Sequence, residues 1–371
     1  MAEFDGPQDW SAAAGGNPFA QEELLREGKA FAQLAGVEAV TVSGPDRLSW
    51  LHNLTTAPFA GLRPGASLEG LILDGNGHVR HAFAAWDDGA KTWLIADAGQ
   101  GETLANFLDS MRFMLRVEVG REDVVAYAML RDASEIPASV SDLALHVWQD
   151  PWPYVLPGGT TYGLDDDSHP AFGTHRAMVV AAAGAGDAVV DALREAGFEA
   201  VPQLVWEAAR IVDRRPRPLT EIADDHVIPH ELDWLRSAVS ITKGCFPGQE
   251  TVSKVINMGR PPRRLTFLYL EGPEGDLPGS GTEITLDGKA VGVLTSSARD
   301  YEEGAVGLAL LKRSVPIDAV VHLGDFVASQ EAVVAPEGRA AASPEEVPGQ
   351  ALRRARAALD ASQKPKRRGD K

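Results

Sequence analysis

The pattern of hydrophobic and polar positions divides the first third of the chain into short helical and extended segments. In residues 21–34, the positions of Leu24, Leu25, Phe31 and Leu34 have helical spacing, which predicts a helix. Apolar runs of strand length follow at 37–42, 71–73 and 92–96. The second of these runs is followed by Asp-Gly-Asn-Gly, which is a strong signal for a hairpin turn at 74–77.

The next segments mix helix and strand signals without a regular alternation. Residues 100–114 carry apolar side chains on one helical face, and the chain then passes into a strand by residue 119. Predicted strands at 144–148 and 176–180 precede a predicted helix at about 188–196. Because the segments do not repeat as strand–helix–strand units, the pattern favours an α+β fold over a doubly wound parallel sheet.

The character of the chain changes after the pair of prolines at 261–262. Short apolar runs at 264–270, 282–286, 290–295 and 320–327 are separated by Gly, Pro and Asp, with no long helix between them. This pattern predicts a small β-barrel. Beyond about residue 332, Ala, Pro, Glu and Arg dominate, which is typical of a disordered end, with a short helix possible at 350–359.

These boundaries give four expected parts. Residues 1–20 form a flexible N-terminal arm, 21–260 an α+β region, 261–331 a C-terminal β-barrel and 332–371 a disordered basic tail. The α+β region is expected to contain two subdomains, at about 21–130 and 131–260. A chain of 371 residues is long enough for two or three domains.

Composition narrows the class of protein and its compartment. No run of 18 apolar residues is present, so we expect no membrane-spanning helix and no membrane partner. Residues 1–5 lack the basic and apolar parts of a secretory signal. One cysteine cannot form an internal disulfide, which fits a reducing cytoplasm. It also excludes an iron–sulfur cluster held by this chain alone, since such a cluster normally takes four cysteines, and we expect no tightly bound metal.

The net charge of −18 argues against broad binding to a nucleic-acid backbone. The charge is uneven, however, because residues 337–371 contain nine basic and five acidic residues. This tail is a candidate for contact with RNA or with an acidic partner. The alternative is a solvated end without a binding role.

The single cysteine, Cys245, stands in the segment Lys-Gly-Cys-Phe-Pro-Gly-Gln-Glu at 243–250. Pro247 suits the first position of a helix, which predicts that Cys245 lies directly before a helix start. There the helix dipole and the nearby Lys243 would both favour a thiolate. The residues alone leave a second reading open, because free cysteines are often buried as small hydrophobic side chains.

The segment resembles the signature of the YgfZ-type folate-binding proteins, relatives of the glycine-cleavage T-protein (aminomethyltransferase). In that family these proteins are implicated in the assembly and repair of iron–sulfur clusters. The likeness covers about residues 35–325. It includes several flanking segments: Val42–Asp46, Trp50–Leu51 with Thr55–Thr56, Arg112–Val119, Ala208–Ile211, Val227–Asp233, Met258–Arg260 and Arg263–Leu265.

The resemblance implies a T-protein-like fold of two interlocked α+β portions around a central pocket, closed by a small C-terminal β-barrel. It also implies that the cofactor is tetrahydrofolate or a derivative. A folate pocket needs apolar or aromatic walls and a cation for the carboxylates. The residues assigned to it are Arg112, Arg116, Arg210, Trp234, Gly248, Gln249 and Glu250. For each arginine, the competing role is an ion pair on a domain face.

The function that the resemblance favours is a folate-binding accessory protein for iron–sulfur enzymes, including enzymes that thiolate tRNA. Cys245 would be the essential thiol and Lys243 its activating neighbour, with folate and iron–sulfur client proteins as partners. One alternative is a folate-dependent aminomethyl- or methyltransferase. The six residues after Gly77 contain no carboxylate where the T-protein family has one, which counts against it. A second alternative is a folate-binding scaffold for a protein partner.

Overall fold

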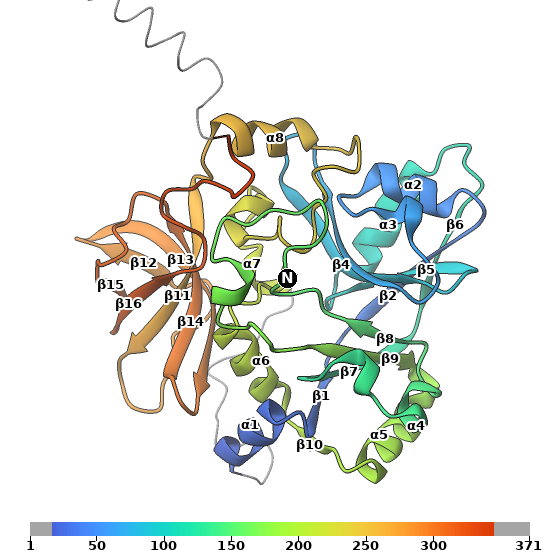
Figure 1. Ribbon diagram of the computed structural model, residues 1–371. Coiled ribbons are helices and arrows are strands. Elements are labelled where there is room, and N and C mark those ends of the chain that lie inside the picture. Colours follow the sequence, from blue (N-terminus) through green and yellow to red (C-terminus); the bar gives the residue numbers. More distant parts are fainter. Residues whose placement is uncertain (1–16, 345–371) are drawn as a thin grey trace, which may run out of the picture.

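The computed structural model describes residues 17–344, which form two five-stranded sheets and a closed barrel (Figure 1). The first sheet has the order β3-β4-β5-β2-β6, and all of its neighbouring strands are antiparallel. Its strands are β2 (Glu38–Ser43), β3 (Ser67–Leu73), β4 (Val79–Asp87), β5 (Lys91–Ala96) and β6 (Glu118–Glu122).

The second sheet has the order β10-β1-β7-β9-β8. One of its strands precedes the strands of the first sheet in the sequence, and the other four follow them. Its strands are β1 (Ala30–Leu34), β7 (Val124–Met129), β8 (His146–Gln149), β9 (Ala177–Ala182) and β10 (Glu199–Val201). β1 pairs in parallel with β10 and antiparallel with β7. The chain therefore starts in the second sheet, completes the first and returns, which interlocks the two halves.

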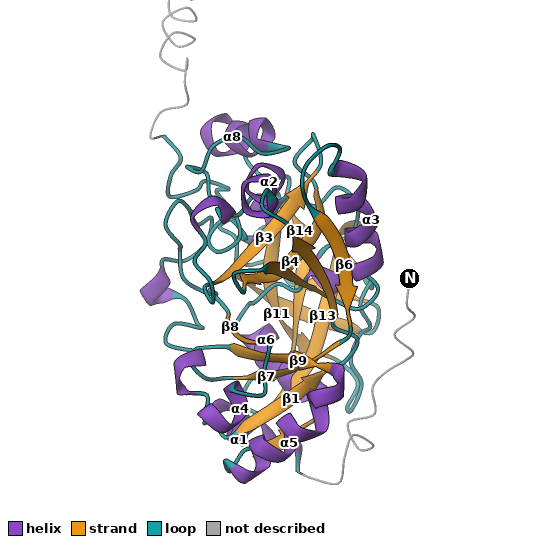
Figure 2. Ribbon diagram, turned by 90° about the vertical axis from the view of Figure 1, so that its right-hand side faces the viewer, coloured by secondary structure: helices purple, strands orange, loops and turns teal. Residues whose placement is uncertain are grey.

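The two sheets pack face to face, and helices cover their outer faces (Figure 2). Trp86 and Trp93 of the first sheet meet Trp148 and Met178 of the second in one buried cluster. The helices are α1 (Pro18–Arg26), α2 (Arg47–Leu54), α3 (Gly101–Met111), α4 (Ala138–Ser141), α5 (Gly186–Glu195), α6 (Gln203–Val212), α7 (Pro218–Glu221) and α8 (Gln249–Met258). α2 and α3 bury their apolar sides on the first sheet, and α4 and α5 bury theirs on the second.

The barrel closes in the order β11-β14-β13-β12-β15-β16. Its strands are β11 (Arg263–Glu271), β12 (Glu283–Leu286), β13 (Lys289–Asp300), β14 (Gly304–Lys312), β15 (Val321–Leu323) and β16 (Phe326–Ala332). α6 packs against β13 and β14, and also against β1, so it joins the barrel to the second sheet. The expected fold class, α+β with a small C-terminal barrel, is confirmed.

Several local predictions are wrong. The predicted helix at 21–34 is α1 followed by β1, because Gly28 adopts a positive φ of 69° and turns the chain after Arg26. The predicted helix at 100–114 ends at Met111, and Phe113 has a positive φ of 44°. The predicted strand at 320–327 is two strands joined by a turn at Gly324. β14 was not anticipated, because a continuous apolar run does not show the alternation of a half-buried strand.

The expected tail from residue 332 differs at its start, because residues 333–344 pack against the body of the protein. Val333 and Val334 are buried, and the Ala335 N–H donates to the Tyr162 carbonyl oxygen at 2.8 Å. The Ser343 hydroxyl donates to the carbonyl oxygen of Ile256 in α8 at 2.8 Å. Most of the expected N-terminal arm, the basic end of the tail and the predicted short helix at 350–359 lie outside the described residues.

Among the helices of residues 17–344, none has the length and apolar character needed to cross a bilayer.

Candidate functional site

A cavity of about 140 Å³ lies between the two sheets and α6. Its apolar wall includes three aromatic side chains, Phe83 of β4, Trp148 of β8 and Trp206 of α6, together with Met178 of β9. Eight charged side chains complete the lining: Glu69, Asp97, Asp150, Arg176, Glu207, Arg210, Arg215 and Arg217. A cavity with aromatic walls and convergent charged groups has the general character of a small-molecule site.

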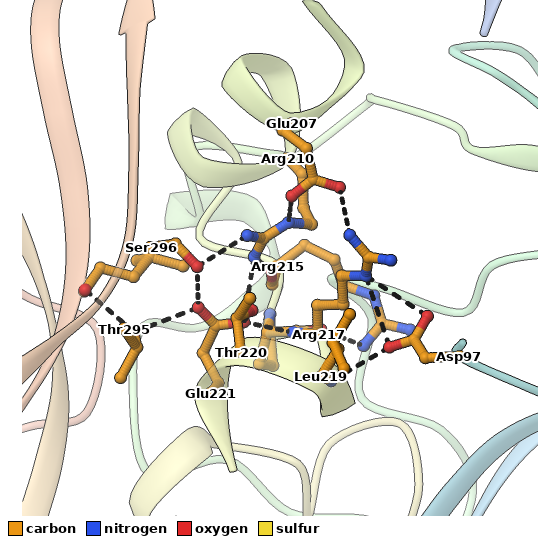
Figure 3. A network of polar contacts seen from close by, with 12 residues as sticks. Asp97, Glu207, Arg210, Arg215, Arg217, Leu219, Thr220, Glu221, Thr295 and Ser296 are labelled. Carbon is orange, nitrogen blue, oxygen red and sulfur yellow. Dashed lines mark hydrogen bonds and ion pairs between the residues drawn. The ribbon is translucent and has the colours of Figure 1, made fainter. Parts of the chain in front are cut away.

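Arg210 is the only one of the sequence-assigned folate residues that lines this cavity. All three of its guanidinium nitrogens are engaged within the protein (Figure 3). Nε donates to Glu207 at 2.8 Å, Nη1 donates to Glu221 at 3.1 Å, and Nη2 donates to the Ser296 hydroxyl of the barrel at 2.8 Å. Arg210 therefore ties α6 to α7 and the barrel and shapes one wall of the cavity.

Arg217 extends this network toward the first sheet. It donates to Glu207 at 2.9 Å and to Asp97 at 3.3 Å, as Figure 3 shows. Burial alone would raise the pKa of Glu207, but the guanidinium groups of Arg210 and Arg217 hold it below its usual range. Glu207 is therefore a fixed negative charge in the wall rather than a group that exchanges protons near neutral pH.

A second cluster joins Arg215 to two carboxylates from different elements. Arg215 donates to Glu69 of β3 at 2.8 Å and to Asp150, just after β8, at 3.0 Å. Burial raises the pKa of Glu69 above its usual range, although Arg215 opposes the shift. Glu69 also accepts a hydrogen bond of 2.6 Å from the Ser237 hydroxyl. The cavity thus contains one carboxyl that is able to hold a proton at a higher pH than an ordinary glutamate.

Arg176 lies immediately before β9, is 2 % exposed and lines the same cavity. Its Nη2 donates to the Ala209 carbonyl oxygen at 3.0 Å and to the Asp213 carboxylate. Its guanidinium carbon lies 4.7 Å from the centre of the Trp206 ring. Nε and Nη1 are buried and have no hydrogen-bond partner among the described residues.

The Lys-Gly-Cys segment lies outside this cavity, on a loop held against the C-terminal end of α2. The side chains of Lys243 and His52 each contact the backbone of the other residue. The Lys243 ammonium donates to the His52 carbonyl oxygen, and His52 Nε2 lies 3.0 Å from the Lys243 carbonyl oxygen. Because His52 Nδ1 accepts the Ala60 N–H at 3.2 Å, the proton of the neutral ring belongs on Nε2. A cation at these carbonyls also suits the negative end of the α2 dipole.

Cys245 is exposed, whereas Lys243 is half-buried and lies 5.1 Å from the centre of the Phe246 ring. Burial lowers the pKa of Lys243 to about 8. The reciprocal bonds with His52 thus fix the base of the loop and leave the thiol open to solvent. The reading of Cys245 as a buried hydrophobic side chain does not apply.

The start of α8 differs from the sequence prediction. The helix begins at Gln249, with Gly248 at the N-cap position, so Pro247 precedes the helix instead of occupying its first position. Gly248 has a φ of 79°, which places it in the left-handed region. Cys245 therefore lies four residues before the helix and not directly at its start.

Gly248 also meets the β3–β4 hairpin predicted at 74–77. A Cβ added at Gly248 would lie 2.6 Å from the Asp74 carbonyl oxygen and 2.9 Å from the Gly77 Cα. From this contact β4 runs inward, and its residues 82–84 line the cavity. Ala82 lies five positions after Gly77, which at about 3.3 Å per residue separates the hairpin from the cavity by about 16 Å.

The remaining assigned residues lie away from the cavity. Arg112 and Arg116 are exposed and form ion pairs with Asp109 at 3.1 Å and Asp46 at 2.7 Å. Trp234 is fully buried between α6, α8 and the barrel. Gln249 and Glu250 lie in the first turn of α8. Apart from Arg210, the structure therefore does not bring the assigned folate residues together in the cavity.

Sequence reasoning missed most of the charged lining. Glu69, Asp97, Asp150, Arg176 and Glu207 come from five separate places in the chain. None stands in a short motif, so no local signal identifies them. The six residues after Gly77 contain no carboxylate, but four carboxylates reach this cavity from other elements.

No protein-family model matches the chain. Four curated proteins do match, and three of them are as follows. A putative chloroplastic transferase of Arabidopsis thaliana is 25 % identical over 317 residues, covering 82 % of this chain and 70 % of that protein. The tRNA-modifying protein YgfZ of Vibrio atlanticus is 23 % identical over 293 residues, covering 77 % and 84 %. The mitochondrial iron–sulfur cluster assembly factor IBA57 of Mus musculus is 36 % identical over 112 residues, covering 29 % and 30 %.

Among solved structures, the glycine cleavage system aminomethyltransferase T of Bartonella henselae matches with a TM-score of 0.61. The match covers 87 % of this chain and 90 % of that one at 16 % identity. The resemblance to YgfZ-type proteins with the T-protein fold is confirmed. In this chain, the cavity and the exposed thiol of Cys245 are two separate features.

Proposed function

We propose that this protein binds a folate in the central cavity and supports the assembly or repair of iron–sulfur enzymes through Cys245. The clients include enzymes that thiolate tRNA. Two relatives support this role by name, one as a tRNA-modifying protein and one as an iron–sulfur cluster assembly factor. The T-protein fold supports a folate as the ligand.

The observation that carries the proposal is the exposure of Cys245 on a loop whose base is fixed by Lys243 and His52. A cluster-bearing client protein is far too large to enter a cavity of about 140 Å³, so the group that serves it must stand at the surface. Cys245 meets this requirement, because its thiol reaches solvent while the backbone beside it is held. The thiol acts as a nucleophile or transient ligand toward the client.

The cavity supports the folate half of the proposal. Its volume is below the range of about 300 to 1,000 Å³ that is usual for whole drug-sized ligands, so it suits one ring system. The flat pterin of a folate fits between aromatic walls, and the rest of the molecule extends away. We place this role in the cytoplasm, where a chain with one unpaired cysteine stays reduced.

The test is complementation in cells that lack their own member of the family. The intact chain, Cys245→Ala, Cys245→Ser and the matched control Thr242→Ala, an exposed residue of the same loop, are expressed at equal levels. The readouts are the activity of iron–sulfur enzymes and the content of 2-methylthio-modified tRNA. We expect rescue by the intact chain and by Thr242→Ala, and loss of most rescue in both cysteine variants.

Full rescue by both cysteine variants would show that the thiol is dispensable. Failure of the intact chain, with all four proteins folded and soluble, would count against the iron–sulfur role itself.

One observation favours a second candidate, a folate-dependent aminomethyl- or methyltransferase. Glu69 is a buried carboxyl in the cavity whose pKa is raised, so it is able to exchange a proton with a bound ligand. Conversion of tetrahydrofolate to methylenetetrahydrofolate in the presence of an aminomethyl donor would support this candidate.

A further inference from the structure

The loop between α3 and β6, residues 112–117, presents apolar side chains to water. Among the large hydrophobic side chains of residues 17–344, Met114 and Phe113 are the most exposed, at 97 % and 82 %. Leu115, the next residue, is 42 % exposed. Single exposed hydrophobic residues are common on protein surfaces, whereas a contiguous apolar patch is typical of an interaction site. Three such residues in a row therefore indicate a contact surface.

The fold holds this loop in its exposed position. The Arg116 N–H donates to the Asp46 carboxylate at 2.9 Å, and the Arg116 guanidinium donates to the same carboxylate at 3.0 and 2.7 Å. The Leu115 N–H donates to the Arg112 carbonyl oxygen at 2.9 Å and closes a turn. Phe113 has a positive φ of 44°, which costs free energy for a residue with a large side chain. Because the Phe113 ring lies in water, its burial does not offset this cost, and such strain is typical of functional segments.

The charges around the loop favour a protein surface over a lipid surface or a nucleic acid. Arg112 pairs with Asp109 at 3.1 Å, and Arg116 pairs with Asp46 at 2.7 Å. Neighbouring carboxylates thus neutralise both arginines of the loop, and the whole chain carries a net charge of −18. Anionic lipids and phosphate backbones are attracted by unpaired basic side chains, which this loop does not offer. Phe, Met and Arg are residue types that are enriched where proteins contact each other.

One helix connects this loop to the loop of Cys245. Asp46, which holds Arg116, immediately precedes α2, and His52, which contacts Lys243, lies in the last turn of α2. These two anchors are six positions apart, which at about 1.5 Å per residue is about 9 Å along the helix. Figure 1 shows both loops at the same edge of the molecule, one at either end of α2. A standard interface buries about 800 Å² on each partner, a patch roughly 30 Å across. A protein that covers the thiol over such an area also reaches residues 113–115.

We propose that residues 113–115 form the docking contact for the iron–sulfur client protein on which Cys245 acts. This inference rests on the proposed function and specifies the surface on which the client lies. Phe113 and Met114 enter an apolar hollow of the client, and its cluster-bearing part then faces Cys245. Because both arginines of the loop are already paired, the contact is apolar, and its affinity changes little with ionic strength.

The first measurement is complementation at low and high expression, in the cells used for the Cys245 variants. The double variant Phe113→Asn with Met114→Gln removes both apolar side chains. Asparagine tolerates a positive φ, so we expect the variant to unfold at the same urea concentration as the intact chain. At low expression we expect it to lose most of the rescue of 2-methylthio-modified tRNA. High expression restores the rescue, because mass action offsets a weakened contact, whereas Cys245→Ala fails at both levels.

The second measurement is titration calorimetry with the host enzyme that attaches the 2-methylthio group to tRNA, purified with its iron–sulfur clusters. We expect the double variant to bind this enzyme about 10- to 100-fold more weakly than the intact chain, at low and at high salt. Phe19→Gln is the matched control, because Phe19 is 54 % exposed and lies on α1, far from α2 in Figure 1. We expect it to bind and to rescue like the intact chain.

Full rescue by the double variant at low expression, with Cys245→Ala inactive, would overturn the docking assignment and leave the role of the thiol in place. Unchanged affinity of the double variant for the enzyme would do the same, and so would the absence of binding by the intact chain. Full rescue by Cys245→Ala would instead contradict the proposed function, so the two failures are distinguishable.

Two other occupants of the loop are tested with the same double variant. One test is flotation with vesicles that contain phosphatidylserine, and the other is the oligomeric state in analytical ultracentrifugation. Binding of the intact chain to the vesicles, lost in the double variant, would assign the loop to a lipid surface. A dimer of the intact chain that dissociates in the double variant would assign it to a second copy of this chain. Either result would overturn the assignment to a client protein.

Discussion

At the scale of single residues, Lys243 combines two properties that are seldom found together on a lysine. Its ammonium is half-buried, which lowers its pKa to about 8, and it lies next to the only thiol of the chain. We predict that one lysine side chain titrates with a midpoint near pH 8 in the folded protein. The measurement is the ¹³Cε chemical shift of labelled lysine as a function of pH, with the resonance identified by its absence in Lys243→Arg.

The matched control for this prediction is Cys245→Ala. The charge of Cys245 opposes the shift and raises the pKa of Lys243, so we expect its removal to move the midpoint further below 8. The folded pKa lies below the unfolded one, so the folded state loses its proton first. The cost of burying the ammonium is therefore present below pH 8 and disappears as the pH rises toward 10.5. Titration of all lysines above pH 10 would contradict the prediction.

The sequence makes Lys243 and Cys245 candidates because they stand in one contiguous motif, but it does not indicate that His52 contacts their loop. His52 lies 191 positions earlier, and only the fold of α2 brings it to the loop. The sequence likewise does not place Arg176 in the cavity, because an arginine before an apolar strand has the same sequence pattern as a surface arginine. Residues that act through a contiguous motif are predictable from sequence, and residues gathered by tertiary contact are not.

At the scale of elements, the close contact between α8 and the β3–β4 hairpin depends on Gly248. A Cβ there would meet backbone atoms of Asp74 and Gly77, and the residue already has a positive φ. We predict that Gly248→Ala lowers the free energy of unfolding by about 3 kcal/mol. The left-handed conformation contributes about 1 to 2 kcal/mol and the steric conflict the rest.

Gly244→Ala is the matched control for this effect. Gly244 also has a positive φ, 108°, but a Cβ there would have no atom within 4 Å. We expect it to lose only the conformational part, about 1 to 2 kcal/mol. Thermal and urea unfolding of both variants measure the difference. Equal losses would show that α8 and the hairpin shift apart at little cost.

Many elements of the fold could be predicted from periodicity, but α2, α6, β7 and β14 were not among them. Two of the errors have definite causes. Leu24 and Leu25 do belong to a helix, but Phe31 and Leu34 continue the apparent helical spacing from inside β1. The positive φ of Gly28 separates the helix from the strand, and the presence of a glycine does not by itself predict a positive φ. β14 was missed for a different reason. It lies between β11 and β13 in the barrel with six of its nine residues buried, and such strands lose the polar face that marks a strand.

At the scale of the whole molecule, both ends of the described chain pack against elements that are distant in the sequence. α1 docks on the barrel, where Arg26 pairs with Asp300 at the end of β13 at 2.6 Å. Residues 333–344 pack beside α8 and Tyr162. No local pattern indicates either contact, because both join segments more than 80 residues apart. The ends of the described chain are therefore held by contacts that no local sequence pattern reveals.

The junction between α1 and the barrel predicts a pH dependence for the stability of the molecule. Glu22 lies beside Asp300, and burial, together with the hydrogen bond to Asp300 and its charge, raises the pKa of Glu22 to about 8. Asp300 keeps a lowered pKa, so the shared proton belongs to Glu22. A raised folded pKa means that the folded state holds this proton after the unfolded state has lost it. The contribution to stability is therefore complete below about pH 4.5 and is lost as the pH rises through about 8.

We predict that Glu22→Gln removes this dependence, because the neutral amide keeps an acceptor for the Tyr301 N–H, which donates to Glu22 at 3.0 Å. Between pH 5 and pH 9, the variant should gain about 2 kcal/mol relative to the intact protein. A free shift from 4.5 to 8 would give more at 1.36 kcal/mol per pKa unit, and solvent relaxation at the junction reduces it. Urea unfolding of both proteins at pH 5, 7 and 9 measures the difference, with Glu23→Gln on the exposed side of α1 as the control for removing a carboxylate.

Parallel pH profiles for the intact protein and Glu22→Gln would mean that Glu22 is already ionised at neutral pH. In that case Arg26 would be paired with two ionised carboxylates, and the junction would carry a net negative charge.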